Sequence, residues 1–187
     1  MQENRGRLWQ MIDQYALITG QNMALSGGGA STFYFDCKKV TLHGEALHLI
    51  ADAILEKINA FPEQPTAIGG LTLGADFIVA GVIMRAYQTD HPTLNGSIVR
   101  KEPKKHGTRS LIENELPSGS PIVVVDDVIT TGGSTIKACD QFLEAGYRIV
   151  GIVALIDREA GGERNLAEKY HRPVYSLFKK RDFPRIP

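Results

Sequence analysis

The sequence contains only two cysteines, Cys37 and Cys139, and has no net charge. The cysteines lie far apart and join no Cys-x-x-Cys or Cys/His cluster, so neither a zinc site nor a disulfide framework is expected. The 21 basic residues balance 21 acidic ones. Because nucleic-acid and anionic-membrane binding rest on an overall basic field, the balance argues against both partners.

Long apolar runs are also missing. None approaches the roughly 18 residues of a membrane span, and the N-terminal segment 1–13 is polar, so we expect neither a membrane segment nor a leader. Two ordinary reduced thiols fit a cytoplasmic protein. Any anion site in such a neutral chain must be local.

The sequence does contain enough hydrophobic residues for a folded core. Hydrophobic residues make up 43% of 187 residues, and at roughly 150 residues per domain we expect one compact domain spanning 1–187.

Hydrophobic periodicity predicts alternating strands and helices. An amphipathic helix, with apolar residues at helical spacing from residue 8, is expected to open the chain and to end near Gly20, followed by a flexible turn at 26–30. Strands are expected at 32–37, 66–70, 97–100, 121–125, 149–156 and 174–177, and helices at 42–58, 76–88, 134–145 and 165–170. Repeated strand-then-helix units indicate an α/β fold with a doubly wound, mainly parallel sheet.

The most informative stretch is 122–135, IVVVDDVITTGGST. A buried strand delivers Asp126 and Asp127 to the carboxyl edge of the sheet, where ligands bind in open α/β folds. The hydroxyl- and glycine-rich loop that follows leads into a helix, whose unpaired N–H groups and dipole favour a phosphate. Hydroxyl donors from this loop are expected to help: Thr130, Thr131, Ser134 and Thr135.

The glycines and the acid pair have separate expected roles. Gly132 and Gly133 allow close backbone approach and positive φ. Because the carboxylates would repel the phosphate, we expect Asp126 and Asp127 to face ribose hydroxyls and a hydrated magnesium ion. A P-loop enzyme is disfavoured because GxxxxGK[ST] is absent, and a receiver domain because its acid pair would lie near the N-terminus.

This stretch resembles the phosphoribosyl pyrophosphate (PRPP) motif of the type I phosphoribosyltransferases. Three further stretches narrow the resemblance to the orotate phosphoribosyltransferase family: 25–36, LSGGGASTFYFD; 100–107, RKEPKKHG; and Asp157-Arg158. The resemblance implies a type I phosphoribosyltransferase-like sheet with a small hood from roughly 1–40 and 158–187. It also implies transfer of the phosphoribosyl group of PRPP to orotate, giving orotidine 5-monophosphate and pyrophosphate.

The resemblance also assigns roles to residues. PRPP would be bound by Arg100, Lys101, Lys104, His106, Asp126, Asp127, Val128, Ile129, Thr130, Thr131, Gly132, Gly133 and Ser134. Orotate would be bound by Thr130 and Arg158, whose guanidinium suits a planar carboxylate. Catalysis would depend on Lys104, His106, Asp126 and Asp127. Mg²⁺ would be held through PRPP and water, with no direct protein ligand.

The basic loop 100–109 would close over the diphosphate of the partner subunit, which implies a homodimer with the loop acting in trans. Fixed cations there would neutralise the leaving group. The segment 69–74, GGLTLG, resembles the family's pyrophosphate loop, although many members have Tyr-Lys where this chain has Thr72-Leu73, and Lys at the position of Ser26.

Two alternatives stay open. One is a phosphoribosyltransferase for another base, such as hypoxanthine or uracil. The other is a non-catalytic PRPP-binding regulator, although such proteins usually carry a nucleic-acid-binding element for which the short N-terminal region leaves no room.

Overall fold

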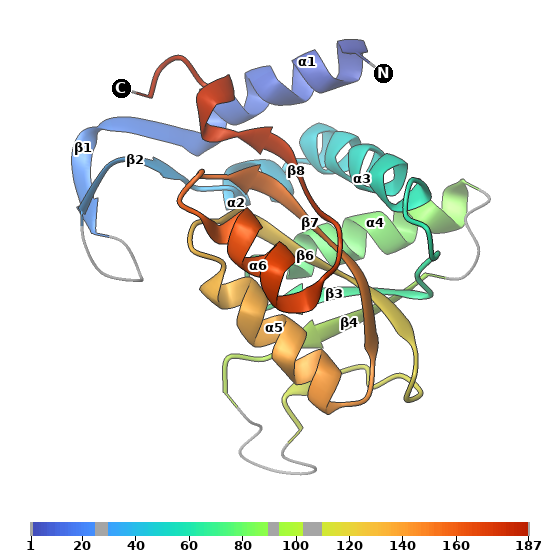
Figure 1. Cartoon of the computed structure of the whole chain (residues 1–187). Helices are drawn as coiled ribbons and strands as arrows, with labels where there is room; N and C mark the ends of the chain where they lie inside the picture. The colour runs from blue at the N-terminus through green and yellow to red at the C-terminus, as the bar shows by residue number, and fades with distance from the viewer. Residues whose placement is uncertain (1, 25–29, 90–93, 103–109, 187) are drawn as a thin grey trace.

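The computed structural model describes residues 2–24, 30–89, 94–102 and 110–186. Its centre is a six-stranded sheet of order β5-β4-β3-β6-β7-β8 (Figure 1). Five strands run parallel: β3 (Ala67–Leu71), β4 (Asn95–Val99), β6 (Pro121–Ile129), β7 (Arg148–Asp157) and β8 (Val174–Lys179). The short β5 (Ile112–Glu113) pairs antiparallel to β4 at one edge.

Helices cover both faces of this sheet, as expected for strands that are apolar on both sides. α3 (Gly44–Asn59) and α4 (Asp76–Gln88) lie on one face, and α5 (Gly133–Glu144) and α6 (Gly162–Tyr170) on the other (Figure 1). Alternate residues of β6 serve the two cores: Val123 and Val125 pack with α3 and α4, and Ile122 and Val124 with α5. The predicted α/β class, with a doubly wound and mainly parallel sheet, is confirmed.

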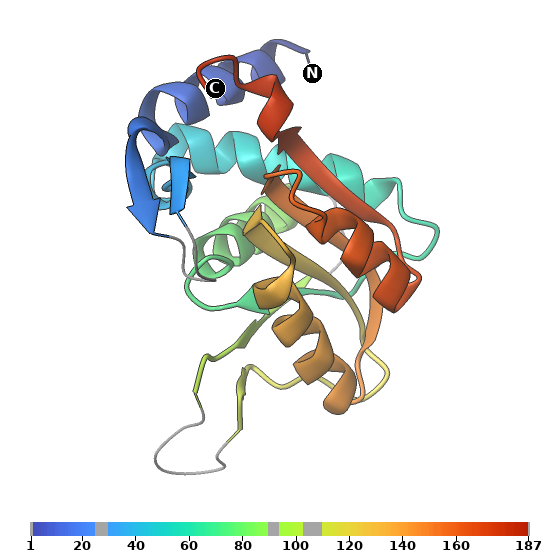
Figure 2. The same ribbon diagram turned by 60° about the vertical axis from the view of Figure 1, so that its left-hand side comes forward.

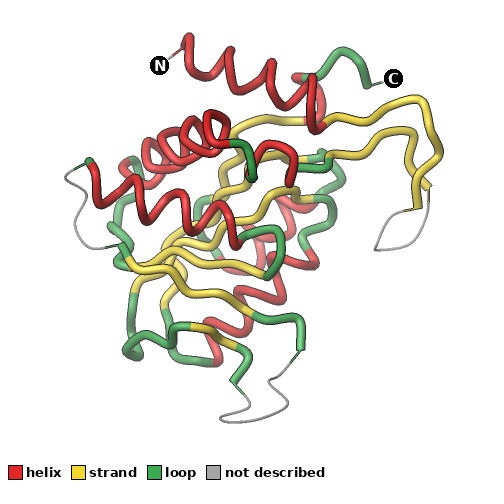
Figure 3. Tube along the Cα trace, turned by 180° about the vertical axis from the view of Figure 1, so that it is seen from behind, coloured by secondary structure: helices red, strands yellow, loops and turns green. Residues whose placement is uncertain are grey.

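A two-stranded hairpin stands apart from the main sheet (Figure 3). It consists of β1 (Leu17–Ala24) and the antiparallel β2 (Ala30–Phe35), and the short α2 (Lys38–Thr41) follows it. The predicted turn at 26–30 falls almost entirely outside the described residues.

The two ends of the chain pack on each other beside this hairpin (Figure 2). α1 (Gln2–Met11) continues as a π-helical turn, Ile12–Ala16, and β8 leads into a 3₁₀ turn, Lys180–Asp182. The Trp9 indole donates to the Asp182 carbonyl at 2.8 Å. The Phe183 ring is fully buried and contacts both Trp9 and Phe35, at centroid distances of 6.1 and 5.1 Å.

Several sequence-based boundaries differ from those in the structure, among them the strand expected at 32–37, which spans Ala30–Phe35. The N-terminal helix ends at Ala16, because Leu17 already pairs with Phe35 in the hairpin and Gly20 has φ +83°. The polar stretch before Pro121 contains β5. The strand predicted to stop at residue 125 continues to Ile129, because β6 keeps pairing with β7 beyond the acidic pair.

Candidate active site

The loop between β6 and α5 has the conformation that its glycines predict. Gly132 is the N-cap residue of α5 and has φ +90°, which a residue with a side chain rarely adopts. Gly133 does not share this conformation, so the positive φ predicted for both glycines is confirmed only at Gly132. The first bond of the helix runs from the Ile136 N–H to the Gly132 carbonyl, at 2.8 Å.

Donors are concentrated at this helix start. The main-chain N–H groups of Gly133, Ser134 and Thr135 make no hydrogen bond to another residue within the described ranges. Gly133 and Ser134 are exposed, and Thr130 is half-buried. With the positive end of a twelve-residue helix behind them, these groups form a site for an anion with several acceptor oxygens.

The two aspartates point to opposite sides of the sheet, because successive residues of a strand alternate. Asp126 lies on the α5 side and is only 5% exposed, whereas Asp127 lies on the α4 side and is half-buried. The pair is therefore divided between the two layers, and this division follows from the extension of β6 beyond residue 125.

Asp126 is bound to the start of α5. Its Oδ2 accepts hydrogen bonds from Ser134 Oγ at 2.7 Å and Thr135 Oγ1 at 2.6 Å. Burial, reinforced by the neighbouring Asp127, raises the pKa of Asp126 to about 7. The Thr135 hydroxyl, which the sequence predicts as a further donor to a phosphate, is 1% exposed and donates to Asp126 in this conformation.

Asp127 faces the loop between β3 and α4, at 69–74. A Cβ at Gly74 would lie only 2.7 Å from Asp127 Oδ1, and one at Gly70 would lie 2.2 Å from the Val125 carbonyl oxygen. Only glycine allows this loop to pass so close to β6. The predicted pyrophosphate loop is thus placed directly beside the Asp127 carboxylate.

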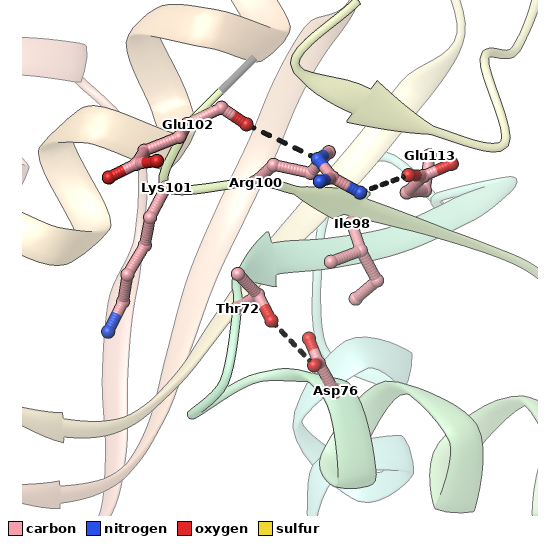
Figure 4. Close-up of a pocket in the computed structure, with 7 residues that line it drawn as sticks. All are labelled: Thr72, Asp76, Ile98, Arg100, Lys101, Glu102 and Glu113. Carbon is pink, nitrogen blue, oxygen red and sulfur yellow. Dashed lines mark hydrogen bonds and ion pairs between the residues drawn. The ribbon is translucent and has the colours of Figure 1, made fainter. Parts of the chain in front are cut away.

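A cavity of about 550 Å³ opens next to this loop (Figure 4). Its lining residues are Thr72, Asp76, Ile98, Arg100, Lys101, Glu102 and Glu113. Thr72 Oγ1 donates to Asp76 Oδ2 at 2.7 Å, and Arg100 Nη1 to Glu113 Oε1 at 2.8 Å. The Lys101 side chain extends away from this ion pair (Figure 4).

α6 supports the loop between β6 and α5, residues 130–132, which we call the phosphate loop after its predicted role. The Gly162 N–H donates to the Thr130 carbonyl at 3.1 Å, and Asn165 Nδ2 to the Thr131 carbonyl at 3.2 Å. A Cβ at Gly162 would fall 2.4 Å from Ile129 Cγ2. The loop is therefore held between the starts of α5 and α6.

Arg158 joins this frame to the hairpin. Its main-chain N–H donates to the Ile129 carbonyl at 2.9 Å, which places it beside Thr130. Its Nη2 donates to Ser31 Oγ at 2.8 Å, and its Cζ lies 4.3 Å from the centroid of the Phe33 ring. Burial lowers the pKa of the guanidinium from its usual value.

The structure thus brings together, at the carboxyl edge of the sheet, the phosphate loop, both aspartates, Arg158 and the start of the basic loop. Lys104 and His106 lie outside the described residues. Asp76 and Glu113, which are bonded to Thr72 and Arg100, lie in no motif of the sequence. Ser31 lies within the stretch 25–36, but nothing in that stretch indicates its bond to Arg158.

The described ranges contain neither a cluster of metal ligands nor a membrane-spanning helix. No group of three or more His, Cys, Asp or Glu side chains is arranged to hold a metal ion there. Nor does any helix in these ranges have the length and apolar character needed to cross a membrane.

Comparison with known proteins agrees with this arrangement. The model of the phosphoribosyl transferase domain family matches residues 38–175. An orotate phosphoribosyltransferase of Aquifex aeolicus (strain VF5) is 42% identical over 177 residues, which cover 94% of each chain.

Solved structures are similar over almost the whole chain. Orotate phosphoribosyltransferase of Mycobacterium tuberculosis H37Rv in complex with Fe(III) dicitrate superposes with a TM-score of 0.81 at 28% identity, covering 96% of this chain and 98% of that one. The same enzyme in complex with PRPP gives a TM-score of 0.77 at 26% identity, with the same coverage. On the strength of these matches, the chain belongs to the orotate phosphoribosyltransferases, a family of pentosyltransferases.

Proposed function

We propose that this protein transfers the 5-phosphoribosyl group of PRPP to orotate, releasing pyrophosphate and forming orotidine 5-monophosphate for pyrimidine synthesis. One observation carries the proposal: the Arg158 N–H is bonded to the Ile129 carbonyl, so a guanidinium suited to a carboxylate sits next to a loop suited to a phosphate. The two substrates of this reaction carry those two groups.

The reaction needs no protein nucleophile. The base nitrogen forms a bond to ribose C1 as the C1–O bond to the diphosphate breaks, through a transition state with oxocarbenium character. The main-chain donors of Gly133 and Ser134 hold the 5-phosphate, and Asp127 orients the ribose hydroxyls. Alignment and electrostatic stabilisation are the protein's contribution.

Asp126 acts in this scheme through the loop that it holds. In the described conformation Oδ2 accepts from Ser134 and Thr135, Oδ1 accepts from the Asp127 N–H, and the side chain is 5% exposed, so a contact with ribose requires a rearrangement. Its proposed ribose role therefore rests on rearrangement, whereas that of Asp127 does not.

We propose Mg²⁺ as the cofactor, carried by PRPP and water. The two aspartates fit a magnesium ion that is bound through its water ligands. Asp127 has a half-buried carboxylate at the surface of the site, whereas Asp126 is buried and already accepts hydrogen bonds. When bound, the ion neutralises charge on the leaving diphosphate. Lys104 and His106 cover the same diphosphate and donate a proton to it.

We propose that the protein works as a homodimer. α4 supports this, because its solvent side carries an apolar stripe at intervals of three and four residues: Phe77, Ala80, Met84 and Tyr87. Met84 and Tyr87 are 60% and 92% exposed, unusually high for large apolar side chains. The stripe begins next to Asp76, which lines the cavity together with residues 100–102, so a second copy docked here would bring the described start of its basic loop near the site.

The dimer is tested by light scattering during size-exclusion chromatography. Tyr87→Glu should give monomers, because it places a charge in the interface. Leu143→Glu is the matched control, since Leu143 is 45% exposed on α5, on the other face of the sheet. Dimers of Tyr87→Glu would exclude the α4 surface.

The trans action of the basic loop is tested by complementation. Lys104→Ala removes a loop cation, and Arg158→Ala removes the base-binding guanidinium. If the loop serves the partner's site, co-expressed hybrid dimers contain one complete site and recover activity that neither variant has alone. If it serves its own subunit, every site of the hybrid has a defect and activity stays low.

The hood and the location of the protein complete the proposal. Segments of roughly 1–40 and 158–187 close the base side of a single domain, because the hairpin reaches Arg158 through Ser31. We place the protein in the cytoplasm, where its two cysteines, both buried and free, would stay reduced.

The decisive experiment incubates the protein with PRPP, Mg²⁺ and a panel of bases. We expect turnover of orotate. Turnover of hypoxanthine or uracil without orotate would assign another base, and PRPP binding without any product would favour a regulator.

A further inference from the structure

Two cations share one aromatic ring at the base side of the site. The Arg158 guanidinium carbon lies 4.3 Å from the centroid of the Phe33 ring, and Lys180 Nζ lies 5.2 Å from it. The ring is 8% exposed and both cationic residues are half-buried. Each distance is within the range of a cation–π contact.

The cations on either side of Lys180 are neutralised. Lys179 Nζ lies 2.8 Å from Glu163 Oε2, and Arg181 Nη2 lies 2.8 Å from Glu159 Oε1. Lys180 has no carboxylate partner among the residues that the structure describes. Of the three consecutive cations 179–181, Lys180 alone has an aromatic ring and no carboxylate as its described partner.

Arg158 is in the same state. Its described partners are neutral, namely Ser31 Oγ, the Phe33 carbonyl and the Phe33 ring. The nearest acids along the chain are committed elsewhere: Glu159 to Arg181, and Asp157 to the Glu159 N–H. Two like charges beside one ring, with no described counter-charge, form a site for an anion.

The sheet explains why these residues meet. β7 and β8 are parallel, and Asp157 is paired with Lys179 at the end of the ladder. Arg158 directly follows β7 and Lys180 directly follows β8. Both residues therefore lie side by side at the carboxyl edge of the sheet, where they reach the Phe33 ring of the hairpin.

We infer that Lys180 is a specificity-determining residue, which with Arg158 holds the carboxylate of the anionic base. The inference rests on the proposed function, which supplies a base bearing a carboxylate. Arg158 gives a planar pair of donors, and Lys180 adds a compact charge from the neighbouring strand end. A neutral base would leave both cations without a counter-ion, so the pair discriminates against it.

The simpler explanation is that the Lys180 stem covers the Phe33 ring and that its charge has no role. Lys180→Met separates the two, because methionine keeps an apolar stem and removes the charge. We expect kcat/KM for orotate to fall by about tenfold, as for loss of one charge-assisted hydrogen bond, with an unchanged KM for PRPP and an unchanged melting temperature. Lys180→Arg should recover most of the loss.

Arg181→Met is the matched control, because it removes a neighbouring cation that is already paired with Glu159. It should leave the KM for orotate at the wild-type value. The inference is overturned if Lys180→Met matches wild type, or if it raises the KM for PRPP alone. Failure of the wild-type protein to use orotate would instead reject the proposed function, so the two results are distinguishable.

Discussion

Thr135 Oγ1 donates a 2.6 Å hydrogen bond to Asp126 Oδ2, and this contact joins the first turn of α5 to strand β6. Both side chains are buried. The conformation of the phosphate loop is therefore set from inside the protein by a carboxylate, as well as by the glycines that shape its outer surface.

Replacing Thr135 by valine tests this contact. Valine keeps the shape but leaves the buried Asp126 carboxylate short of a donor, so we expect a loss of about 1–3 kcal/mol in the free energy of unfolding. The KM for PRPP should rise by about tenfold, because the helix start loses its anchor. Thr135→Ser keeps the hydroxyl and should stay near wild type. Urea unfolding measures the free energy of unfolding, and steady-state kinetics measure the KM for PRPP. An unaltered KM in Thr135→Val would contradict the anchoring role.

The pH dependence of stability should report Asp126. Its pKa is raised from 3.8 to about 7, so between these values the folded protein holds a proton that the unfolded chain has released. The resulting contribution to stability is fully present below about pH 4 and is lost as pH rises through about 7, at up to about 1.4 kcal/mol per pH unit.

The uncharged variant Asp126→Asn isolates this effect. The free energy of unfolding, measured without ligand at pH 4.5 and 7.5, should fall more for wild type than for the variant over the pH interval. Parallel pH profiles for the two proteins would show that Asp126 does not titrate there.

Gly162→Ala should disturb the phosphate loop from below. The new methyl group would lie 2.4 Å from Ile129 Cγ2 and 2.6 Å from the Thr130 carbonyl oxygen. We expect a loss of about 1–3 kcal/mol and a higher KM for PRPP. Gly6→Ala is the control: it has no atom within 4 Å and sits in α1, so it should stabilise the protein by about 0.5–1 kcal/mol. A wild-type KM in Gly162→Ala would show that α6 does not support the loop.

Arg158→Ala should raise the KM for orotate by about 10- to 100-fold and change that for PRPP little, because the guanidinium pairs with the base carboxylate. Ser31→Ala is the informative control, since it removes the hydroxyl contact between the hairpin and Arg158 and leaves the guanidinium and its contacts with Phe33 in place. If Ser31→Ala has the same effect as Arg158→Ala, the arginine acts by positioning the hairpin. Equal effects of Arg158→Ala on both substrates would reject the carboxylate assignment.

The parts of this fold that the sequence predicts are those built from neighbouring residues. The strand, acid pair, glycine loop and helix of 122–135 are contiguous, so their order and the positive φ at Gly132 were predicted from the sequence. Binding of a phosphate by this loop stays a prediction. Strand β1 was missed because Leu17–Ala24 contains a glycine and polar residues and is defined by its pairing with β2.

Long-range contacts had no local signal. Ser31 meets Arg158 across 127 positions, and Lys180 reaches Phe33 only because β7 and β8 end together. The burial of Asp126 follows from alternation along a strand, but only once the strand is known to extend past residue 125.

The bond from the Arg158 N–H to the Ile129 carbonyl has a consequence for redesign. A shift of the main chain after β7, as from an insertion or deletion, would move the proposed phosphate loop together with the proposed base pocket and would weaken the binding of both substrates at once. The hairpin and the turn after β8 lie on the proposed base side, where the side chains of Ser31 and Lys180 contact Arg158 and the Phe33 ring. New base preferences, whether selected in the laboratory or in nature, are most accessible through Ser31, Phe33 and Lys180.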